Sequence, residues 1–366
     1  MASIIDPVLD TIDSFLGWIS TSLKQTTESY CELETADSDH VLVAYDGSLV
    51  SLLKIDGVKA LVGTPEFERL HEGINLSLQS AMSRPGHAIQ FLFHYDKERA
   101  PDLIQNIFSP AQATAQELRL ELSDLFSERV KFLSEYCAQE SLYFVLWTRP
   151  TVLTSDQNKK AIEKKSEFIK ANKIPAFTRT QNVMAAIPDL RDSHESFVRA
   201  TVNDLSALNI QLDVLPVHEA VYEMRKIVDP EFTAREWRPV LPGDKITVKD
   251  YKRFTGDLSD LLWPPLARQI FPRDAENLDL KTVKIGDKIY SSVFIDLFPK
   301  DIKMFVSLFQ RTLAARIPWR MSFFTESNGL SSIRLKAMFA SILSFTSEQN
   351  RLLSDANNLL KYININ

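Results

Sequence analysis

The chain carries the same series of secondary-structure signals twice, and this repeat constrains the fold more than any other feature. In the first repeat, 41–95, two apolar runs flank Asp46-Gly47, a helix opens at Thr64-Pro65, and the apolar run 89–93 follows. An Asp-Gly pair between apolar runs is a strong signal for a tight β-hairpin, because glycine readily takes the positive φ of such a turn. Thr and Pro suit the first turn of a helix. The repeat therefore predicts a hairpin, a helix and a strand.

The second repeat, 283–324, has the same order of signals. Gly286-Asp287 lies between two apolar runs, Pro299 precedes a helical stripe, and 319–324 is again an apolar run. Units of this kind form antiparallel sheets with helices on one face. We predict an α+β fold with two related hairpin–helix–strand lobes, an N-terminal amphipathic helix and a long C-terminal helix.

The composition changes along the chain and suggests six segments. Spaced apolar positions give way to polar stretches, and prolines cluster between the two repeats. We predict an amphipathic helix at 1–24, a tether at 25–39, a first α+β lobe at 40–150, a middle helical and strand segment at 151–228, a Pro-rich crossing segment at 229–277, and a second α+β lobe with the long C-terminal helix at 278–366.

Two helices of the first lobe have apolar positions at helical spacing. The first is expected to bury Phe67, Leu70, Ile74, Leu78 and Met82, and the second is expected to run unbroken over 111–137. Its inward stripe is predicted to hold Leu118, Leu122, Leu125, Val130, Leu133 and Tyr136. A strand is predicted at 142–148, where Tyr, Phe, Val and Trp dominate.

Composition excludes some classes of function. The chain has 366 residues and a net charge of −6, which disfavours bulk nucleic-acid binding, since that rests on neutralising phosphates with Lys and Arg. No apolar run is long enough to span a bilayer. Cys31 and Cys137 do not form a disulfide framework, which favours a reducing, cytoplasmic environment.

The N-terminal stripe offers a candidate partner-binding surface. Its apolar residues follow helical spacing, and no Lys or Arg precedes Lys24. Interfacial membrane helices usually carry basic polar faces, so a protein partner is favoured over lipid, with packing on its own chain as the alternative. The candidate residues are Ile5, Leu9, Ile12, Leu16 and Ile19.

Two further segments could bind partners. Trp263, Pro264 and Pro265 form a proline-stiffened apolar tip, and partner docking and packing on the chain's own sheet are equally favoured there. The Lys-rich helix 155–173 could form a basic patch. Interspersed Glu163 and Glu167 favour an ordinary solvated helix face.

The sequence carries no local signature of catalysis. Phosphate-binding glycine loops and a nucleophile elbow are absent, and no histidines are spaced as metal ligands. We therefore expect no catalytic, cofactor-binding or metal-binding residue in this chain. A Ser, His and Asp brought together only by the fold remains an alternative, as triads are spatial arrangements.

The first repeat, with its hairpin 41–55, the Thr64-Pro65 helix start and the strand 86–95, resembles the N-terminal domain of VirB-type ATPases of type IV secretion and conjugation machines. The segment 289–313, with Phe298-Pro299 at its joint, is similar to the later part of that domain. The opening, 4–28, looks closest to the Dot/Icm, or type IVB, branch.

The resemblance implies an inner-membrane-associated cytoplasmic ATPase that assembles as a ring. The ATP- and magnesium-binding residues of the family belong to a C-terminal motor domain, and no residue here matches them. The chain would then be a docking and oligomerising piece, peripheral at the membrane through protein contacts. The implied partners are other copies of itself, as a ring or dimer, inner-membrane secretion proteins and a second secretion ATPase. The alternatives are a stand-alone hydrolase and a nucleic-acid-handling module.

Overall fold

The computed structural model of the chain describes residues 31–60, 62–82, 84–174, 177, 180–229, 231–232, 236–244, 263–279, 281–292, 310–314 and 317–327. The expected helices at 1–24 and after residue 328 lie outside these ranges. So do the five N-terminal candidate residues Ile5, Leu9, Ile12, Leu16 and Ile19.

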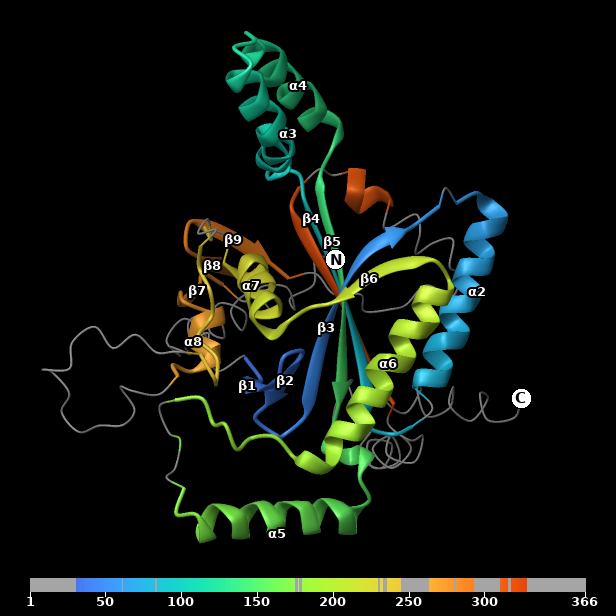
Figure 1. The fold of residues 1–366 in the computed structure, drawn as a ribbon, viewed down its shortest axis with the longest axis vertical. Helices are drawn as coiled ribbons and strands as arrows, with labels where there is room; N and C mark the ends of the chain where they lie inside the picture. Colours follow the sequence, from blue (N-terminus) through green and yellow to red (C-terminus); the bar gives the residue numbers. More distant parts are fainter. Residues whose placement is uncertain are drawn as a thin grey trace, which may run out of the picture.

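An antiparallel sheet forms the centre of the described structure (Figure 1). Its strand order is β1-β2-β3-β5-β4-β10, and β6 pairs with the second half of β3, beyond the end of β2. The strands are β1 (Leu33–Ser38), β2 (Val41–Ala44), β3 (Leu49–Val58), β4 (His87–Asp96), β5 (Gln139–Thr148), β6 (Ile210–Val214) and β10 (Trp319–Glu326).

The predicted hairpin turn at Asp46-Gly47 is confirmed. Gly47 has a φ of +84°, a conformation that L side chains rarely adopt, and Asp46 Oδ1 accepts the backbone N–H of Ser48 at 2.9 Å. A Cβ at Gly47 would also meet the side chain of Ile187 at 2.9 Å. Glycine is therefore required here both for the turn and for close packing.

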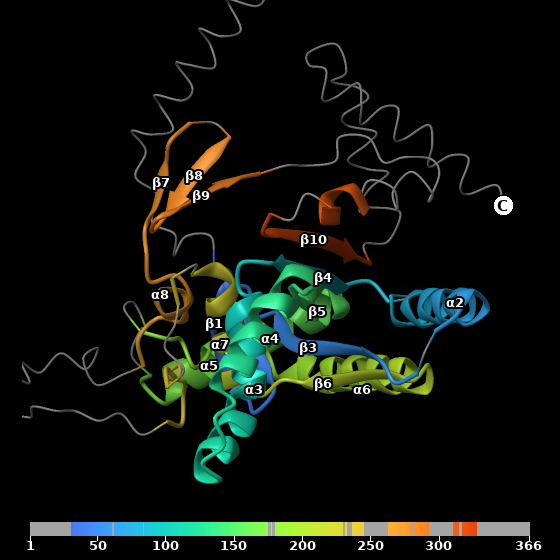
Figure 2. The same ribbon diagram turned by 90° about the horizontal axis from the view of Figure 1, so that it is seen from above.

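Alternation along the strands gives the sheet two apolar faces. On β5, Tyr143, Val145 and Trp147 lie on one face, and Phe144 and Leu146 lie on the other. The first face packs against α7 (Val217–Val228) and α8 (Leu266–Ile270). The second packs against α2 (Thr64–Ala81) and α6 (Arg191–Ala207). Figure 2 shows the two helix pairs on opposite sides of the sheet.

The remaining elements lie around this core. Helix α5 (Ser155–Ala171) packs through Ala161 near the β2–β3 turn, with the short 3-10 turns Pro150–Val152 and Pro188–Leu190 close by. A small antiparallel sheet contains β7 (Ala275–Asn277), β8 (Thr282–Ile285) and β9 (Lys288–Ser291). No helix in the described ranges is long and apolar enough to cross a membrane.

The α+β class is confirmed, but the second repeat does not form a separate lobe in the described residues. Its hairpin, β8–β9, lies in the small sheet, whereas its last strand, β10, pairs with β4 of the first repeat over its whole length. An unpaired edge on β4 would leave a row of backbone groups without partners, and β10 supplies them. The last strand of the second repeat therefore belongs to the sheet of the first.

Three local predictions are corrected. The expected tether at 25–39 contains β1, which pairs with β2 and contributes buried Leu33 to the core. The expected crossing segment contributes Leu266, Ala267 and Ile270 to the same core. Phe67, expected in the buried stripe of α2, is 61% exposed, while the other four positions pack beneath the sheet.

The helix predicted over 111–137 is two helices, which is a fourth correction. Helices α3 (Ala100–Glu117) and α4 (Ser123–Tyr136) form an antiparallel hairpin between β4 and β5. Leu118, Leu125 and Tyr136, which we expected to face inward, are exposed. The predicted Lys-rich helix 155–173 is confirmed as α5, and the predicted middle helical and strand segment contains α5, α6, β6 and α7.

Candidate interaction surface

The α3–α4 hairpin rises from a well-fixed base. Strands β4 and β5 remain paired up to Asp96, the last residue of β4, and Gln139, the first residue of β5, so the sheet is complete where the hairpin begins. Asp96 Oδ1 accepts the backbone N–H groups of Glu98 and Arg99 at 2.9 and 3.3 Å. On the other side, Lys97 Nζ donates to the carbonyl oxygen of Glu135 at 2.7 Å. These contacts fix the direction in which the hairpin leaves the sheet.

Beyond this base, the two helices pack mainly against each other. Helix α3 buries Ala100, Ile104 and Ala115, and α4, all of which the structure describes, buries no residue. The rings of Phe108 and Phe126 meet across the pair at 5.8 Å. In Figure 1 the hairpin projects from one end of the sheet, away from α2, α6 and α7. A pair of helices without a third layer cannot cover its own apolar side chains.

The turn between the helices has a defined geometry. Arg119 takes a positive φ of 54°, and the backbone N–H groups of Arg119 and Leu120 donate to the carbonyl oxygens of Gln116 and Ala115 at 3.0 and 2.8 Å. This is the hydrogen-bond pattern of a Schellman motif, which ends a helix with a left-handed residue. The turn reverses the chain and leaves the leucines beside it facing outward.

The end of the hairpin presents leucines surrounded by carboxylates. Leu118, Leu120 and Leu125 are 64%, 51% and 47% exposed. We call these three leucines, with the exposed carboxylates beside them, the tip surface. Four acidic residues flank the leucines within 117–128, and Arg119 is the sole basic residue of that stretch. The carboxylates are those of Glu117, Glu121, Asp124 and Glu128.

The second segment singled out from the sequence packs on its own chain. Gln181 is fully buried; its backbone N–H donates to the carbonyl oxygen of Trp263 at 3.1 Å, and its side-chain Nε2 donates to that of Pro264 at 2.9 Å. Trp263 and Pro265 are half-buried, and Pro264 is exposed. Trp263 therefore packs on its own chain. Of the three residues predicted to form the apolar tip, only Pro264 is open to a partner.

The fold also brings together a polar group that no local pattern predicted. His194 of α6 lies between Ser51 of β3 and Thr148 of β5, with Nε2 and Nδ1 each 2.9 Å from a hydroxyl oxygen. Ser51 Oγ donates its hydrogen to the carbonyl oxygen of His40 at 2.8 Å, so it must accept from Nε2. Thr148 then donates to Nδ1, and the ring is the neutral Nε2–H tautomer.

This arrangement pins α6 to the sheet and does not prepare a nucleophile. A catalytic histidine would accept the serine hydrogen, whereas here it donates to Ser51, and the orienting group is a hydroxyl in place of a carboxylate. Both side chains are buried. Burial in the apolar core, helped by neighbouring His87, lowers the pKa of His194 to about 4, so the ring is neutral near pH 7.

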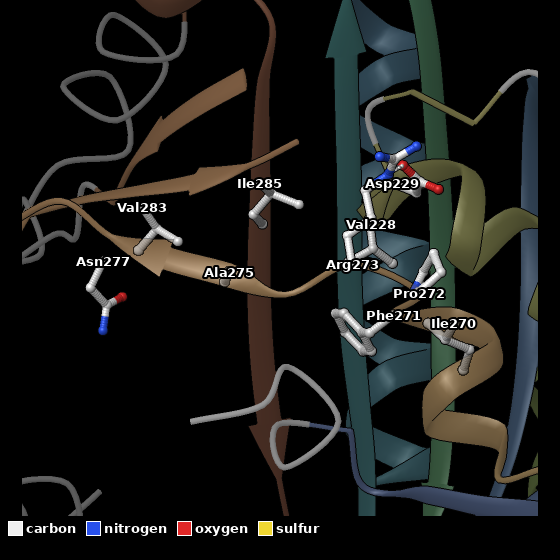
Figure 3. Close-up of a pocket in the computed structure, with 10 residues that line it drawn as sticks. All are labelled: Val228, Asp229, Ile270, Phe271, Pro272, Arg273, Ala275, Asn277, Val283 and Ile285. Atoms are coloured by element: carbon white, nitrogen blue, oxygen red, sulfur yellow. Dashed lines mark hydrogen bonds and ion pairs between the residues drawn. The ribbon is translucent and has the colours of Figure 1, made fainter. Parts of the chain in front are cut away.

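An apolar pocket of about 250 Å³ lies between the end of α7, α8 and the small sheet (Figure 3). Ile270, Phe271 and Val283 are among its walls. At its edge, buried Asp229 accepts from Arg273 Nε at 3.1 Å, so the carboxylate is already engaged within the chain. The pocket has room for an apolar side chain or a small apolar molecule, and its charged residues are paired with each other.

Metal-binding and thiol chemistry receive no support from the part of the chain that is described. Within those ranges no three His, Cys, Asp or Glu side chains are grouped as metal ligands. Cys31 is buried, which raises the pKa of its thiol to about 11, and Cys137 is exposed near the hairpin base. Both cysteines are free thiols.

Comparison with known proteins assigns neither a family nor a function to the chain. No protein-family model matches the chain, and none of the curated proteins matches it either.

Proposed function

We propose that this chain is a non-catalytic docking and assembly module that binds protein partners through the tip surface. The observation that carries the proposal is the hairpin itself, which exposes three leucines at the end of a rigid base while the sheet below buries its apolar residues on both faces. Contiguous apolar surface that is rimmed by polar groups is typical of protein interaction sites.

The family resemblance suggests where in the cell such a module would act. An N-terminal domain of a VirB-type secretion ATPase would sit on the cytoplasmic side of the bacterial inner membrane and be recruited there by protein contacts. ATP and magnesium would then be bound by a separate motor domain. The N-terminal stripe, with Leu9, Ile12 and Leu16 at its centre, would add a second partner-binding surface.

Replacing the hairpin tests the role of the tip surface. Residues 98–137 are exchanged for an Asp-Gly turn, which the paired ends of β4 and β5 accommodate. The shortened chain should keep its circular dichroism and cooperative unfolding but lose co-purification with the membrane complex. The exposed Gln116→Ala substitution on the same hairpin is the matched control and should behave as the unmodified chain. Full recruitment of the folded, shortened chain would remove the proposal.

The alternative of a hydrolase gains no support from the contact between Ser51 and His194 in the core. Its Ser51 is buried and gives its hydrogen to a backbone carbonyl. The pocket that His194 lines, about 210 Å³ in volume, also holds the Arg191–Asp37 ion pair, which engages both groups. A Ser51→Ala chain that lost a measurable esterase or peptidase activity, while remaining folded, would reopen this reading.

A further inference from the structure

The large apolar side chains that are exposed on α3 and α4, both described in full, all lie on one face of the hairpin. The rings of Phe108 and Phe126 meet between the helices and mark the inward direction of each. At about 100° per residue, the exposed apolar residues lie about 80–140° around each helix from that ring, in the same rotational sense. Because the helices are antiparallel, the same sense brings both sets to one face. The set is Leu103, Ile107, Leu118, Leu125, Phe132 and Tyr136, each 39% to 73% exposed.

We call these six residues the hairpin face. It includes two leucines of the tip surface and continues from them toward the base, where the rings of Phe132 and Tyr136 lie 5.2 Å apart. Helix α3 has 18 residues, so the face extends over roughly 27 Å. In Figure 1 the hairpin stands at one end of the molecule, and beyond the base its helices pack mainly against each other.

The opposite face of the hairpin has a different chemistry. Rotation by about 60–100° in the other sense reaches only serines and glutamines on both helices. These residues are Gln105, Ser109, Gln116, Ser123, Ser127 and Ser134. Gln105 donates to the side chain of Gln112 at 2.8 Å, and Ser127 donates to a carbonyl oxygen of its own helix. The hairpin therefore sorts its exposed residues into one polar face and one apolar face.

Carboxylates border the hairpin face. Glu128 and Glu135 lie four residues before and three residues after Phe132, so both neighbour its ring on the surface of α4. Glu117 lies on the outer side of α3, and Arg129 lies on the face itself. All four are exposed, and three carboxylates with one guanidinium give a net charge of −2. A partner with cationic groups beside its own apolar residues would complement this border.

The shape of the surface favours a helix as the partner. Two helices that lie side by side and share an apolar face lack the third element that would cover it. A helix with one apolar stripe supplies that element by lying along the pair, as amphipathic helices do on apolar surfaces made of helices.

Charge disfavours three other occupants. The N-terminal stripe of the chain itself carries Asp6, Asp10 and Asp13 and no cation before Lys24, so it would bring carboxylates to the border. The same face of a second copy would place like charges opposite each other. Anionic lipid attracts basic surfaces and would be repelled by this one.

We infer that the hairpin face binds an amphipathic helix of another protein, in which Lys or Arg residues flank the apolar stripe. The inference rests on the proposed function. It extends the contact from the tip surface along the length of the hairpin and specifies the chemistry of the partner.

Three labelled peptides of 18 residues test the inference on the full chain by fluorescence anisotropy. The first has leucines at helical spacing flanked by lysines, the second has the same leucines flanked by glutamates, and the third has the residues of the first in scrambled order. The lysine peptide should bind about tenfold more tightly than either of the others and should gain helical circular dichroism on binding. Equal binding of the lysine and scrambled peptides, or no binding of any peptide, would overturn the inference.

Substitutions locate the binding surface. Ile107→Ser with Phe132→Ser should weaken binding of the lysine peptide by about tenfold or more, because both side chains are exposed near the middle of the face. Phe67→Ser removes an equally exposed ring from α2 and should bind as the unmodified chain does. So should Ser109→Ala with Ser127→Ala, on the polar face. An equal loss in either control would show that the peptide binds elsewhere. Circular dichroism checks the fold of each variant.

Charge reversal of the border tests the cationic flanks. Glu128→Lys with Glu135→Lys should reverse the preference, so that the glutamate peptide binds more tightly than the lysine peptide. A role of these carboxylates in folding alone would not produce such a reversal. Glu68→Lys with Glu72→Lys, at exposed positions of α2, changes the net charge equally and should keep the original preference. An unchanged preference in the border variant would contradict the inference.

Lipid and a second copy are tested with the same face variant. The unmodified chain should not sediment with vesicles of phosphatidylcholine and phosphatidylglycerol. Vesicle binding that Ile107→Ser with Phe132→Ser abolishes would assign the face to lipid. A dimer that the same variant dissociates in analytical ultracentrifugation would assign it to a second copy. Either result would overturn the inference.

The outcomes also separate this inference from the function on which it rests. If the hairpin exchange abolishes recruitment but the chain does not discriminate among the peptides, the hairpin binds a partner of another kind and the inference is wrong. If the lysine peptide binds as expected but recruitment survives the exchange, the face binds helices and the proposed role in recruitment is wrong.

Discussion

In the sheet, Leu53 and Leu146 are completely buried against α6 and α2, whereas in the hairpin Leu118 and Leu120 are more than half exposed. Both regions are equally regular in backbone structure. The difference lies in the number of layers, since the sheet has helices on each face and the hairpin has only its own partner helix. Regular structure alone therefore does not indicate where a chain is stabilised, and the hairpin is the region whose apolar residues are left for other molecules.

The largest expected effect comes from shortening one leucine in each region. Leu146→Ala opens a cavity in a filled core and should lower the free energy of unfolding by about 2–5 kcal/mol. Leu118→Ala removes an exposed side chain and should change it by no more than about 0.5 kcal/mol. Urea unfolding followed by circular dichroism measures both. Similar losses for the two variants would show that the hairpin is not an independent, uncovered region.

Acid should weaken the sheet through His194. The folded state binds a proton there near pH 4, but the unfolded chain does so near the ordinary value of 6.5. Because the unfolded state binds more protons between these values, stability falls as the pH is lowered through this window, by roughly 2 kcal/mol from pH 7 to pH 5. Burial lowers the pKa of His94 to about 4 as well, so the unmodified chain should lose more than this.

A substitution separates the contribution of His194 to this loss of stability from that of His94. A His194→Asn chain should be less stable at pH 7 but should lose less on acidification than the unmodified chain does. The control is His71→Gln, at an exposed position of α2, which should leave the pH dependence unchanged. Equal pH dependence in all three chains would contradict the neutral, buried ring.

The next effect is the loss of one buried hydrogen-bond partner. Ser51→Ala leaves the Nε2–H group of His194 without an acceptor and should cost about 1–3 kcal/mol. Ser127→Ala, on exposed α4, removes a hydroxyl that bonds only to its own helix and should be nearly neutral. Thermal unfolding of the two variants compares them. A neutral Ser51→Ala would mean that the hydroxyl is not the acceptor of the ring hydrogen.

The smallest effect concerns the hairpin turn. Arg119→Gly places a residue without Cβ at a positive φ and should stabilise the hairpin locally by about 1 kcal/mol. Hydrogen exchange at the amides of α3 and α4 should slow by several-fold, while exchange in the sheet stays the same. Faster exchange in the hairpin would show that the arginine side chain contributes more than the backbone conformation costs.

The sequence predicted the elements that depend on neighbouring residues. Gly47 specified its turn, and the aromatic and β-branched run 142–148 specified a strand. The sequence predicted helices on one face of the sheet, whereas apolar residues of this strand pack against helices on both faces. It did not predict the break after Glu117, because neither Gly nor Pro marks it and an arginine takes the left-handed position that glycine usually fills. For this reason the sequence placed Leu118 and Leu125 in a buried stripe, although both are exposed.

Contacts between distant segments also could not be predicted from the sequence. The pairing of β10 with β4 joins residues more than two hundred positions apart, and a doubled pattern predicts two similar units without saying whether they share a sheet. His194, Ser51 and Thr148 belong to three different elements, α6, β3 and β5, and the fold brings them together. Nothing local marks such a meeting, so the polar contact in the core and the exposed end of the hairpin could be seen only in the fold.

Strands β4 and β5 pair to their very ends, and this has a consequence for how the hairpin between them could change over evolution. Adding or removing one helical turn in both α3 and α4 would lengthen or shorten the arm by about 5.4 Å and leave the sheet untouched. The reach of the hairpin is thus adjustable by insertions within 97–138, independently of the stability of the sheet that carries it.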